Sequence, residues 1–128
     1  MMGRRIVQRS DSDCGICVVQ LLAGVTYDEA LAAVFPRNVP EPNRRWTSSR
    51  QLSAALKRLG IKCDERARPL FGRSYKDLEH DAILLCDKRA DWTWHWCVWD
   101  HKRKRVIDPA KRPKRRWRVT SFLKVHRD

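Results

Sequence analysis

The sequence predicts an α+β domain in which N-terminal helices pack on a C-terminal antiparallel sheet. Segments with helical spacing and capping signals come first, and short strand-like runs follow Gly60. Elements that are segregated in this way, rather than alternating, are typical of α+β proteins and not of doubly wound folds. A chain of 128 residues is long enough for one hydrophobic core, so a single domain is expected over residues 1–128.

Three helices are expected, at residues 13–22, 27–34 and 49–59. Each begins at residues that favour a helix start, namely Asp13, Thr26 in a T-x-x-E capping box, and Thr47 with Ser48. Gly24 and Gly60 stand where helices commonly end. Residues 4–8 are expected to form a short strand or an extended lead-in, and the proline-rich stretch before the third helix is expected to be a loop.

Four strands are expected beyond Gly60, at residues 61–64, 82–86, 94–100 and 105–108. Turn-like residues at 101–104 separate the last two, which predicts a hairpin. Residues 117–119 are expected to add an edge strand, and residues 120–126 a short closing helix or strand. No run approaches the roughly 20 apolar residues of a membrane span, so no membrane partner is expected.

The first residues and the cysteines predict a cellular compartment. The start, MMGRRIVQRSDSD, has arginines but no apolar segment of the signal-peptide type, so a cytoplasmic location is expected. The five cysteines lack the spacing of a disulfide framework and are therefore expected to be reduced thiols.

Positive charge gathers in a basic C-terminal segment at about residues 101–128. The formal net charge of the chain is +13, and this segment carries 12 Lys or Arg against two acids. Such a segment can bind a nucleic-acid backbone, attract an acidic protein or form a solvated face, and the sequence leaves the three open. The run KRPKRRWR also has the look of a nuclear signal, although short basic runs match by chance. The candidate contact residues are Lys102, Arg103, Lys104, Arg105, Lys111, Arg112, Lys114, Arg115 and Arg116.

Cys14, His95 and Asp108 form a candidate set for thiol catalysis. Cys14 opens the apolar run DCGICVVQLL, where the helix dipole and backbone N–H groups favour a thiolate in a partly open site. Asp13 is expected to cap this helix, and Gly15 keeps its first turn uncrowded. His95 can take the thiol proton and return it to a leaving group, while Asp108 fixes the imidazole ring.

Gln8 precedes Cys14 by six positions and completes the candidate set. Its side chain, together with the Cys14 backbone N–H, can donate to a developing oxyanion. Each of the four residues alone has an ordinary explanation: a buried cysteine, a sheet histidine, a turn aspartate before proline and an uninformative glutamine. Their combination is what indicates catalysis.

Side chains alternate along the strand expected at 94–100, so that its two faces carry different residues. His95, Cys97 and Trp99 share one face. Trp94, Trp96 and Val98 share the other. One of these faces is expected to meet the helix that bears Cys14, with Asp108 on the neighbouring strand.

The order of these residues resembles that of the papain-like bacteriocin-processing peptidases, which cleave after double-glycine leaders. The shared features are Q-x5-C with the cysteine in D-C-G, a later strand histidine and then D-P, over about residues 6–109. TSSRQLSAALKRLGI is also similar to that family's helix after its G-T-S segment, with Trp46 in place of the glycine. The resemblance implies a papain-like fold with Cys14 as nucleophile, His95 as base, Asp108 as its orienting partner and Gln8 as oxyanion residue.

The expected activity is that of a stand-alone cysteine peptidase. The family's processing domains usually precede a transporter domain and an ATPase, and this chain is expected to be free-standing. The helix CVVQLLAG and the tryptophan-rich strand segment differ from the family, so leader specificity is not carried over. A peptide or isopeptide bond would be hydrolysed through an acyl thioester on Cys14, and an amine in place of water would make the same site an acyltransferase. No metal or organic cofactor is implied.

Three other interpretations compete with this one. Cys14-x-x-Cys17 matches a redox or zinc half-site, but no strand leads into it and no second pair of ligands has matching spacing. The tryptophans could stack nucleic-acid bases, although alternating strand tryptophans more often pack in a core. The main alternative is a non-catalytic, peptidase-like module that binds nucleic acid or an acidic protein through its basic segment.

Overall fold

The computed structural model of this chain describes residues 6–86, 94–111 and 118–127. Its three α-helices are α1 (Cys14–Ala23), α2 (Tyr27–Val34) and α3 (Ser49–Arg58). Capping boxes start α2 at Thr26 and α3 at Ser48, and Gly24 ends α1 in the left-handed conformation at φ 67°. The predicted helices are confirmed, although Ser48 rather than Thr47 caps the third.

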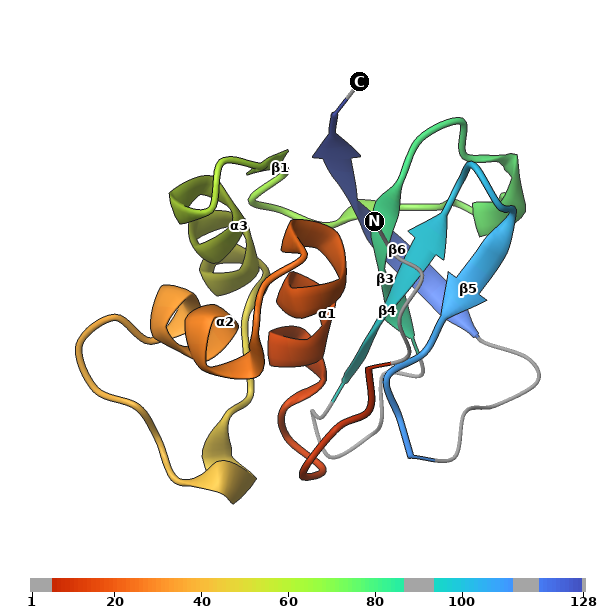
Figure 1. Cartoon of the computed structure of the whole chain (residues 1–128). Coiled ribbons are helices and arrows are strands. Elements are labelled where there is room, and N and C mark those ends of the chain that lie inside the picture. The colour runs from red at the N-terminus through yellow and green to blue at the C-terminus, as the bar shows by residue number, and fades with distance from the viewer. Residues whose placement is uncertain (1–5, 87–93, 112–117, 128) are drawn as a thin grey trace.

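The strands form one antiparallel sheet. They are β1 (Lys62–Cys63), β2 (Arg68–Pro69), β3 (Ala82–Cys86), β4 (His95–Asp100), β5 (Arg105–Ile107) and β6 (Val119–His126). The order is β1-β6-β3-β4-β5, and β2 also pairs with β6. The four predicted strands and the β4–β5 hairpin are present, β3 with the predicted bounds and β1, β4 and β5 with slightly shorter ones. The fold is therefore α+β, with three helices packed on an antiparallel sheet (Figure 1).

The last strand differs from its prediction. The strand alternative for residues 120–126 is confirmed, but residues 119–126 form one strand with no separate edge strand before it, and this strand lies inside the sheet between β3 and the short β1 and β2. Residue 117 lies outside the described part of the chain. Phe122, Leu123 and Val125 are buried, so side chains from both faces of β6 enter the core. The prediction of an edge was wrong because pairing order depends on distant residues.

Both faces of the sheet are covered. One face carries Ile83, Trp96, Val98 and Leu123 against the three helices, with α1 between the sheet and the other helices in Figure 1. The opposite face carries Leu84, Cys97, Trp99 and Phe122 under Leu70 and Leu78 from the connection between β2 and β3. Short 3₁₀ turns at Pro42–Arg44 and Tyr75–Asp77, and strand β2, were not predicted.

The N-terminal lead-in and the helix lengths complete the description. Residues 6–8 are irregular rather than a strand, and the Gln8 N–H donates to the Pro109 carbonyl at 2.7 Å. Among the described residues, no single helix has the length and apolar composition to cross a membrane. Only α1 and α2 taken together reach that length, and they meet at a bend of 111°.

Candidate active site

Cys14 lies at the point where α1 meets an open stretch of the β4 edge. Strand β5 pairs only with Val98–Asp100, so it does not cover the first residues of β4. There the Trp96 backbone N–H donates to Cys14 Sγ at 3.4 Å. The residue is only 2% exposed, which corrects the expectation of a partly open position. The thiol is therefore fixed at the first position of a buried helix.

Asp13 precedes Cys14 but does not cap the helix through its side chain, contrary to the prediction. Its buried carboxylate accepts hydrogen bonds from the backbone N–H groups of Arg9 and Ser10 and from the Tyr27 hydroxyl, at 2.8–3.2 Å. These hydrogen bonds hold residues 9–13 in a tight loop that leads into α1. The Asp13 side chain therefore accepts no hydrogen bond from the first turn of α1.

Gly15 allows the loop before α3 to pass directly over the start of α1. A Cβ atom at position 15 would lie 2.0 Å from Thr47 Oγ1, which is incompatible with the present packing. The Thr47 carbonyl accepts from the indole N–H groups of Trp94 and Trp96 at 3.0 and 3.1 Å. Gly15, Thr47 and the two indoles thus hold the loop, α1 and β4 together beside Cys14.

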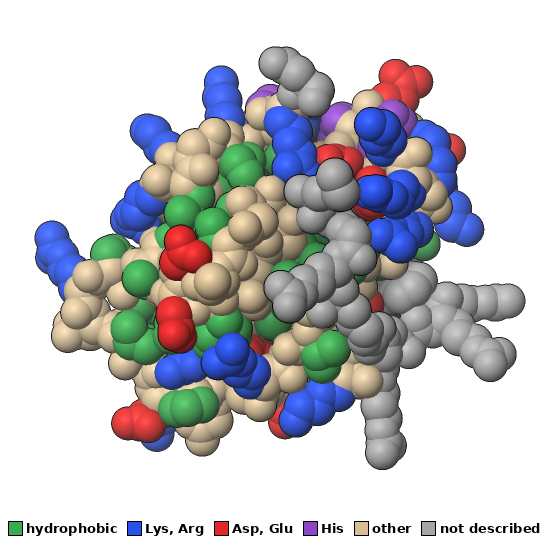
Figure 2. Space-filling model, in the orientation of Figure 1, with side chains coloured by type: hydrophobic (Ala, Val, Ile, Leu, Met, Phe, Trp, Pro, Cys, Tyr) green, Lys and Arg blue, Asp and Glu red, His purple; other side chains and the backbone are tan. Residues whose placement is uncertain are grey.

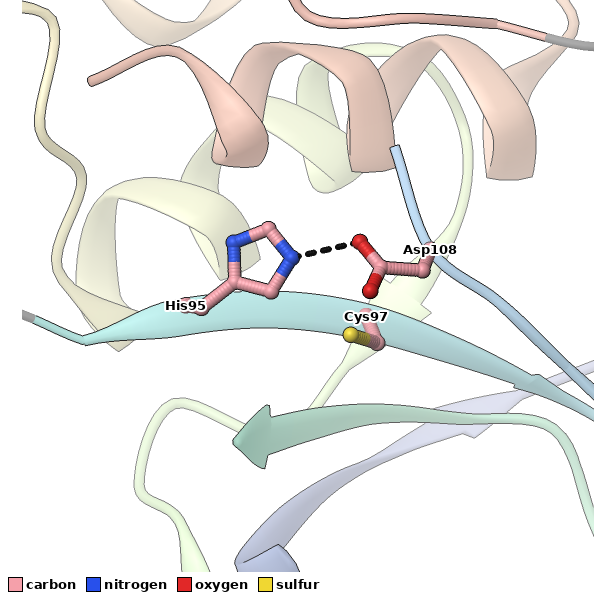
Figure 3. Close-up of side chains that lie close together, drawn as sticks. All are labelled: His95, Cys97 and Asp108. Atoms are coloured by element: carbon pink, nitrogen blue, oxygen red, sulfur yellow. Dashed lines mark hydrogen bonds and ion pairs between the residues drawn. The ribbon is translucent and has the colours of Figure 1, made fainter. Parts of the chain in front are cut away.

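His95 and Asp108 form a short hydrogen-bonded pair. His95 Nε2 lies 2.6 Å from Asp108 Oδ1, and their side chains are 25% and 3% exposed (Figure 3). The Ala110 N–H also donates to Asp108 Oδ1 at 2.9 Å and helps to orient the carboxylate. Because Nε2 is engaged with Asp108, Nδ1 is the ring nitrogen available to Cys14.

The imidazole of His95 is held in its charged form. Burial alone would lower the pKa of His95, but hydrogen bonds to Asp108 and Cys14 and the charges of both groups raise it from 6.5 to about 10. At neutral pH the ring consequently carries both protons. A protonated imidazole beside a sulfur nucleophile is ready to donate to a leaving group.

The predicted alternation along β4 is confirmed, but the helices meet the face without the histidine. Trp96 and Val98 pack against the helices, whereas Cys97 and Trp99 belong to the cluster on the opposite face. His95 is the first residue of β4 and reaches the site at the end of the sheet. This is sufficient because Cys14 lies at the strand edge rather than over either face.

Gln8 lies next to the site but its side chain is engaged elsewhere. Its Nε2 donates to the Ser10 carbonyl at 2.9 Å and to Asp13 Oδ1 at 3.4 Å, and its backbone bonds to Pro109. The structure therefore brings Cys14, His95 and Asp108 into direct contact. Gln8 connects the segment around Asp13 with the segment around Pro109 through its side-chain and backbone hydrogen bonds.

The other four cysteines are free and buried. Burial raises the pKa of the Cys17 thiol, and burial with the nearby Asp64 raises that of Cys63 to about 12. Cys17 lies in the core and forms no disulfide with Cys14. The Cys17 and Cys63 thiols are poor candidates for a nucleophile because these raised pKa values keep them protonated at neutral pH.

Cys97 is the site neighbour that the sequence analysis did not assign to any chemistry. Its Sγ, a ring nitrogen of His95 and a carboxylate oxygen of Asp108 lie within 4.8 Å of one another. Figure 3 shows its thiol beside the His95–Asp108 pair on β4. The signal was present in the alternation of β4, which already placed Cys97 on the histidine face.

The basic residues of the C-terminal segment are only partly described. Lys102, Arg103, Lys104, Arg105 and Lys111 are exposed, and Figure 2 shows Lys and Arg side chains gathered over the β4–β5 end of the sheet. Arg103 and Arg105 each lie within 4.0 Å of the buried Asp100 carboxylate. The other predicted contact residues, Arg112, Lys114, Arg115 and Arg116, lie outside the described residues.

Comparison of this chain with protein-family models, with curated proteins and with solved structures finds no significant match.

Proposed function

We propose that this chain is a papain-like cysteine peptidase with Cys14 as nucleophile, His95 as acid and base, and Asp108 as the residue that orients the imidazole. The observation that carries the proposal is the chain of contacts from the Cys14 thiol through His95 to Asp108, with the thiol at a helix N-terminus. This combination is how thiol nucleophiles are activated on unrelated folds.

The reaction follows from the positions of these groups. Cys14, whose thiol proton has passed to Nδ1 of His95, attacks the carbonyl carbon of the substrate through Sγ, and the carbonyl electron pair moves onto oxygen. His95 then donates the Nδ1 proton to the leaving nitrogen as the C–N bond breaks, which leaves an acyl thioester on Cys14. Water attacks the thioester, its proton returns to His95, and Cys14 is released.

The oxyanion is stabilised by the Cys14 backbone N–H and by the Gln8 side-chain amide. Gln8 becomes a donor when its long 3.4 Å hydrogen bond to Asp13 is exchanged for one to the substrate oxygen. Its shorter bond to the Ser10 carbonyl, at 2.9 Å, keeps the amide in place during this exchange. A side-chain donor to the oxyanion is worth roughly 10²–10³ in turnover.

Selective alkylation tests the nucleophile assignment. All five cysteines are buried, so a fast reaction at one of them reflects chemistry rather than exposure. We expect iodoacetamide near pH 6 to label Cys14 at least ~10-fold faster than any other thiol, as measured by peptide mass mapping. His95→Ala should remove the difference. Equal labelling of Cys17 or Cys97 would contradict the assignment.

Turnover tests the reaction itself. With a pool of fluorogenic peptides, Cys14→Ala and His95→Ala should each abolish hydrolysis while the circular dichroism spectrum stays unchanged, and Cys17→Ala serves as the matched control at a buried thiol of the same helix. A folded Cys14→Ala variant that still hydrolyses the pool would exclude the mechanism. Added hydroxylamine, which captures a thioester, separates hydrolysis from acyl transfer by the products formed.

A further inference from the structure

Three side chains of metal-binding type, His95 among them, lie close together where the His95 ring faces Asp108. His95, Cys97 and Asp108 can each offer one ligand atom, and these atoms all lie within 4.8 Å of one another. The group is built on β4 and the residue that follows β5, and Cys97 and Asp108 are both buried (Figure 3). Among the described residues no other three such side chains are placed so closely.

The donor types select the class of cation. One sulfur, one imidazole nitrogen and one carboxylate oxygen suit zinc and related transition metals, whereas calcium and magnesium prefer oxygen ligands alone. Bonds of about 2.0–2.3 Å to a tetrahedral zinc ion bring ligand atoms to within ~4 Å of each other, so small side-chain movements complete the site. Three protein ligands leave the fourth position to water, on the partly exposed side of His95.

We propose that His95, Cys97 and Asp108 form an inhibitory binding site for a zinc-class divalent cation. When the cation binds, the Nε2 proton of His95 and the thiol proton of Cys97 leave to solvent. Nitrogen, sulfur and the carboxylate oxygen become its ligands. Binding requires only these three residues. The inhibition, in contrast, rests on the proposed function of Cys14 and His95.

The inhibition has a structural cause. With Nε2 bound to the cation, Nδ1 keeps the single remaining ring proton and the ring is neutral. Donation of this proton to the leaving nitrogen would turn the ring into an imidazolate anion, which is far less favourable than deprotonation of an imidazolium, so the acid step of acylation is impeded. Asp108 also leaves its role as hydrogen-bond partner of the imidazole. Cation binding therefore prevents His95 from acting as acid and base, without any contact between the cation and Cys14.

Binding is tested on the Cys14→Ala variant, which removes the nucleophile and keeps the three ligands. Calorimetric titration with zinc chloride should show one site, and cobalt chloride should give a sulfur-to-metal charge-transfer absorption. Cys97→Ala in this background should weaken zinc binding by at least ~10-fold and abolish the absorption. Cys17→Ala is the matched control, because Cys17 is an equally buried thiol on α1 and is not one of the three ligands.

The outcomes separate this inference from the proposed function. Zinc binding that Cys97→Ala and Asp108→Asn leave unchanged, or that Cys17→Ala removes instead, would overturn the site. In the active chain, zinc should inhibit peptide hydrolysis. The hydrolysis rate of Cys97→Ala, normalised to its own rate in the presence of a chelator, should be at least ~10-fold less sensitive to zinc. A chain that binds zinc at these residues but never hydrolyses peptides would refute only the proposed function. An active chain without the zinc site would refute only this inference.

Discussion

His95 is the residue whose protonation sets the chemistry of the site. Desolvation opposes its charge, yet Asp108 at 2.6 Å and the nearby Cys14 outweigh that effect, so the pKa reaches about 10. A carboxylate that is 3% exposed has few water molecules to compete for it. The proton is therefore already on the imidazole at neutral pH, so His95 acts first as an acid in the proposed reaction.

Replacement of Asp108 should lower the pKa of His95. Asp108→Asn keeps the size of the side chain but removes its charge. Burial, which lowers the pKa of His95, is then less opposed, so this pKa should fall well below 10. The His95 Cε1–H resonance followed by NMR across pH measures this directly. Asp64→Asn is the control, because Asp64 contacts His126 instead and should leave the His95 titration unchanged. An unaltered His95 titration in Asp108→Asn would show that Asp108 does not hold the proton.

The same coupling predicts a stability difference with a definite sign. Because the folded pKa of His95 is raised above 6.5, its contribution to stability is fully present below that value and is lost as pH rises through about 10. The unfolding free energy of the native chain should therefore fall toward that of Asp108→Asn across this interval. Urea titrations at several pH values test it.

The residues of the site differ in how far sequence could define them. Cys14, His95 and Asp108 were predictable because a thiol at a helix start, a strand histidine and an acid on the next strand form a recognisable chemical set. The partners of Gln8 were not, because its bonds to Ser10 and Asp13 depend on the path of an irregular loop. The proposed cation site was not predicted, because spacing along the sequence shows no second pair of zinc ligands and the three residues meet only through the pairing of strands.

At the scale of elements, the start of α1 is fixed by packing rather than by its own cap. Thr26 and Ser48 were identified as caps from sequence because a capping box is a local contact. Asp13 was assigned the same role and instead binds backbone N–H groups before the helix. What holds α1 in place is the close passage of Thr47 over Gly15, a contact between segments 32 positions apart that periodicity cannot reveal.

Gly15→Ala should therefore be destabilising even though alanine favours helices. The added Cβ would lie 2.0 Å from Thr47 Oγ1, and relief of such crowding typically costs ~1–3 kcal/mol of unfolding free energy. In a Thr47→Gly background the obstructing side chain is absent, so Gly15→Ala should become neutral or stabilise by up to ~1 kcal/mol. Urea denaturation of the four chains measures the cycle. The same penalty in both backgrounds would show that Thr47 is not the cause.

At the scale of the whole molecule, the class of fold was predictable and the order of the sheet was not. Helix and strand periods are properties of short segments, and their segregation along the chain gave α+β correctly. The place of β6 between β3 and the β1–β2 edge depends on pairing across more than 30 residues, as in Leu84 with Phe122. A strand with buried residues on both faces fits the interior of a sheet better than its edge.

The position of the positive charge, rather than its sum, should determine binding to polyanions. If the basic segment contacts a nucleic-acid backbone, neutralising five of its residues to Gln should lower the slope of log affinity against log salt by up to about 4.5 for a mixed-sequence DNA duplex. These residues are Lys111, Arg112, Lys114, Arg115 and Arg116. A control with the same loss of charge neutralises exposed residues on other segments, namely Arg37, Arg44, Arg50, Lys57 and Lys62. Fluorescence anisotropy at several salt concentrations should show a large effect in the first variant and a small one in the control, while hydrolysis of neutral peptides stays unchanged in both. Equal losses in the two variants would mean that net charge alone attracts the duplex and that the segment is a solvated basic face.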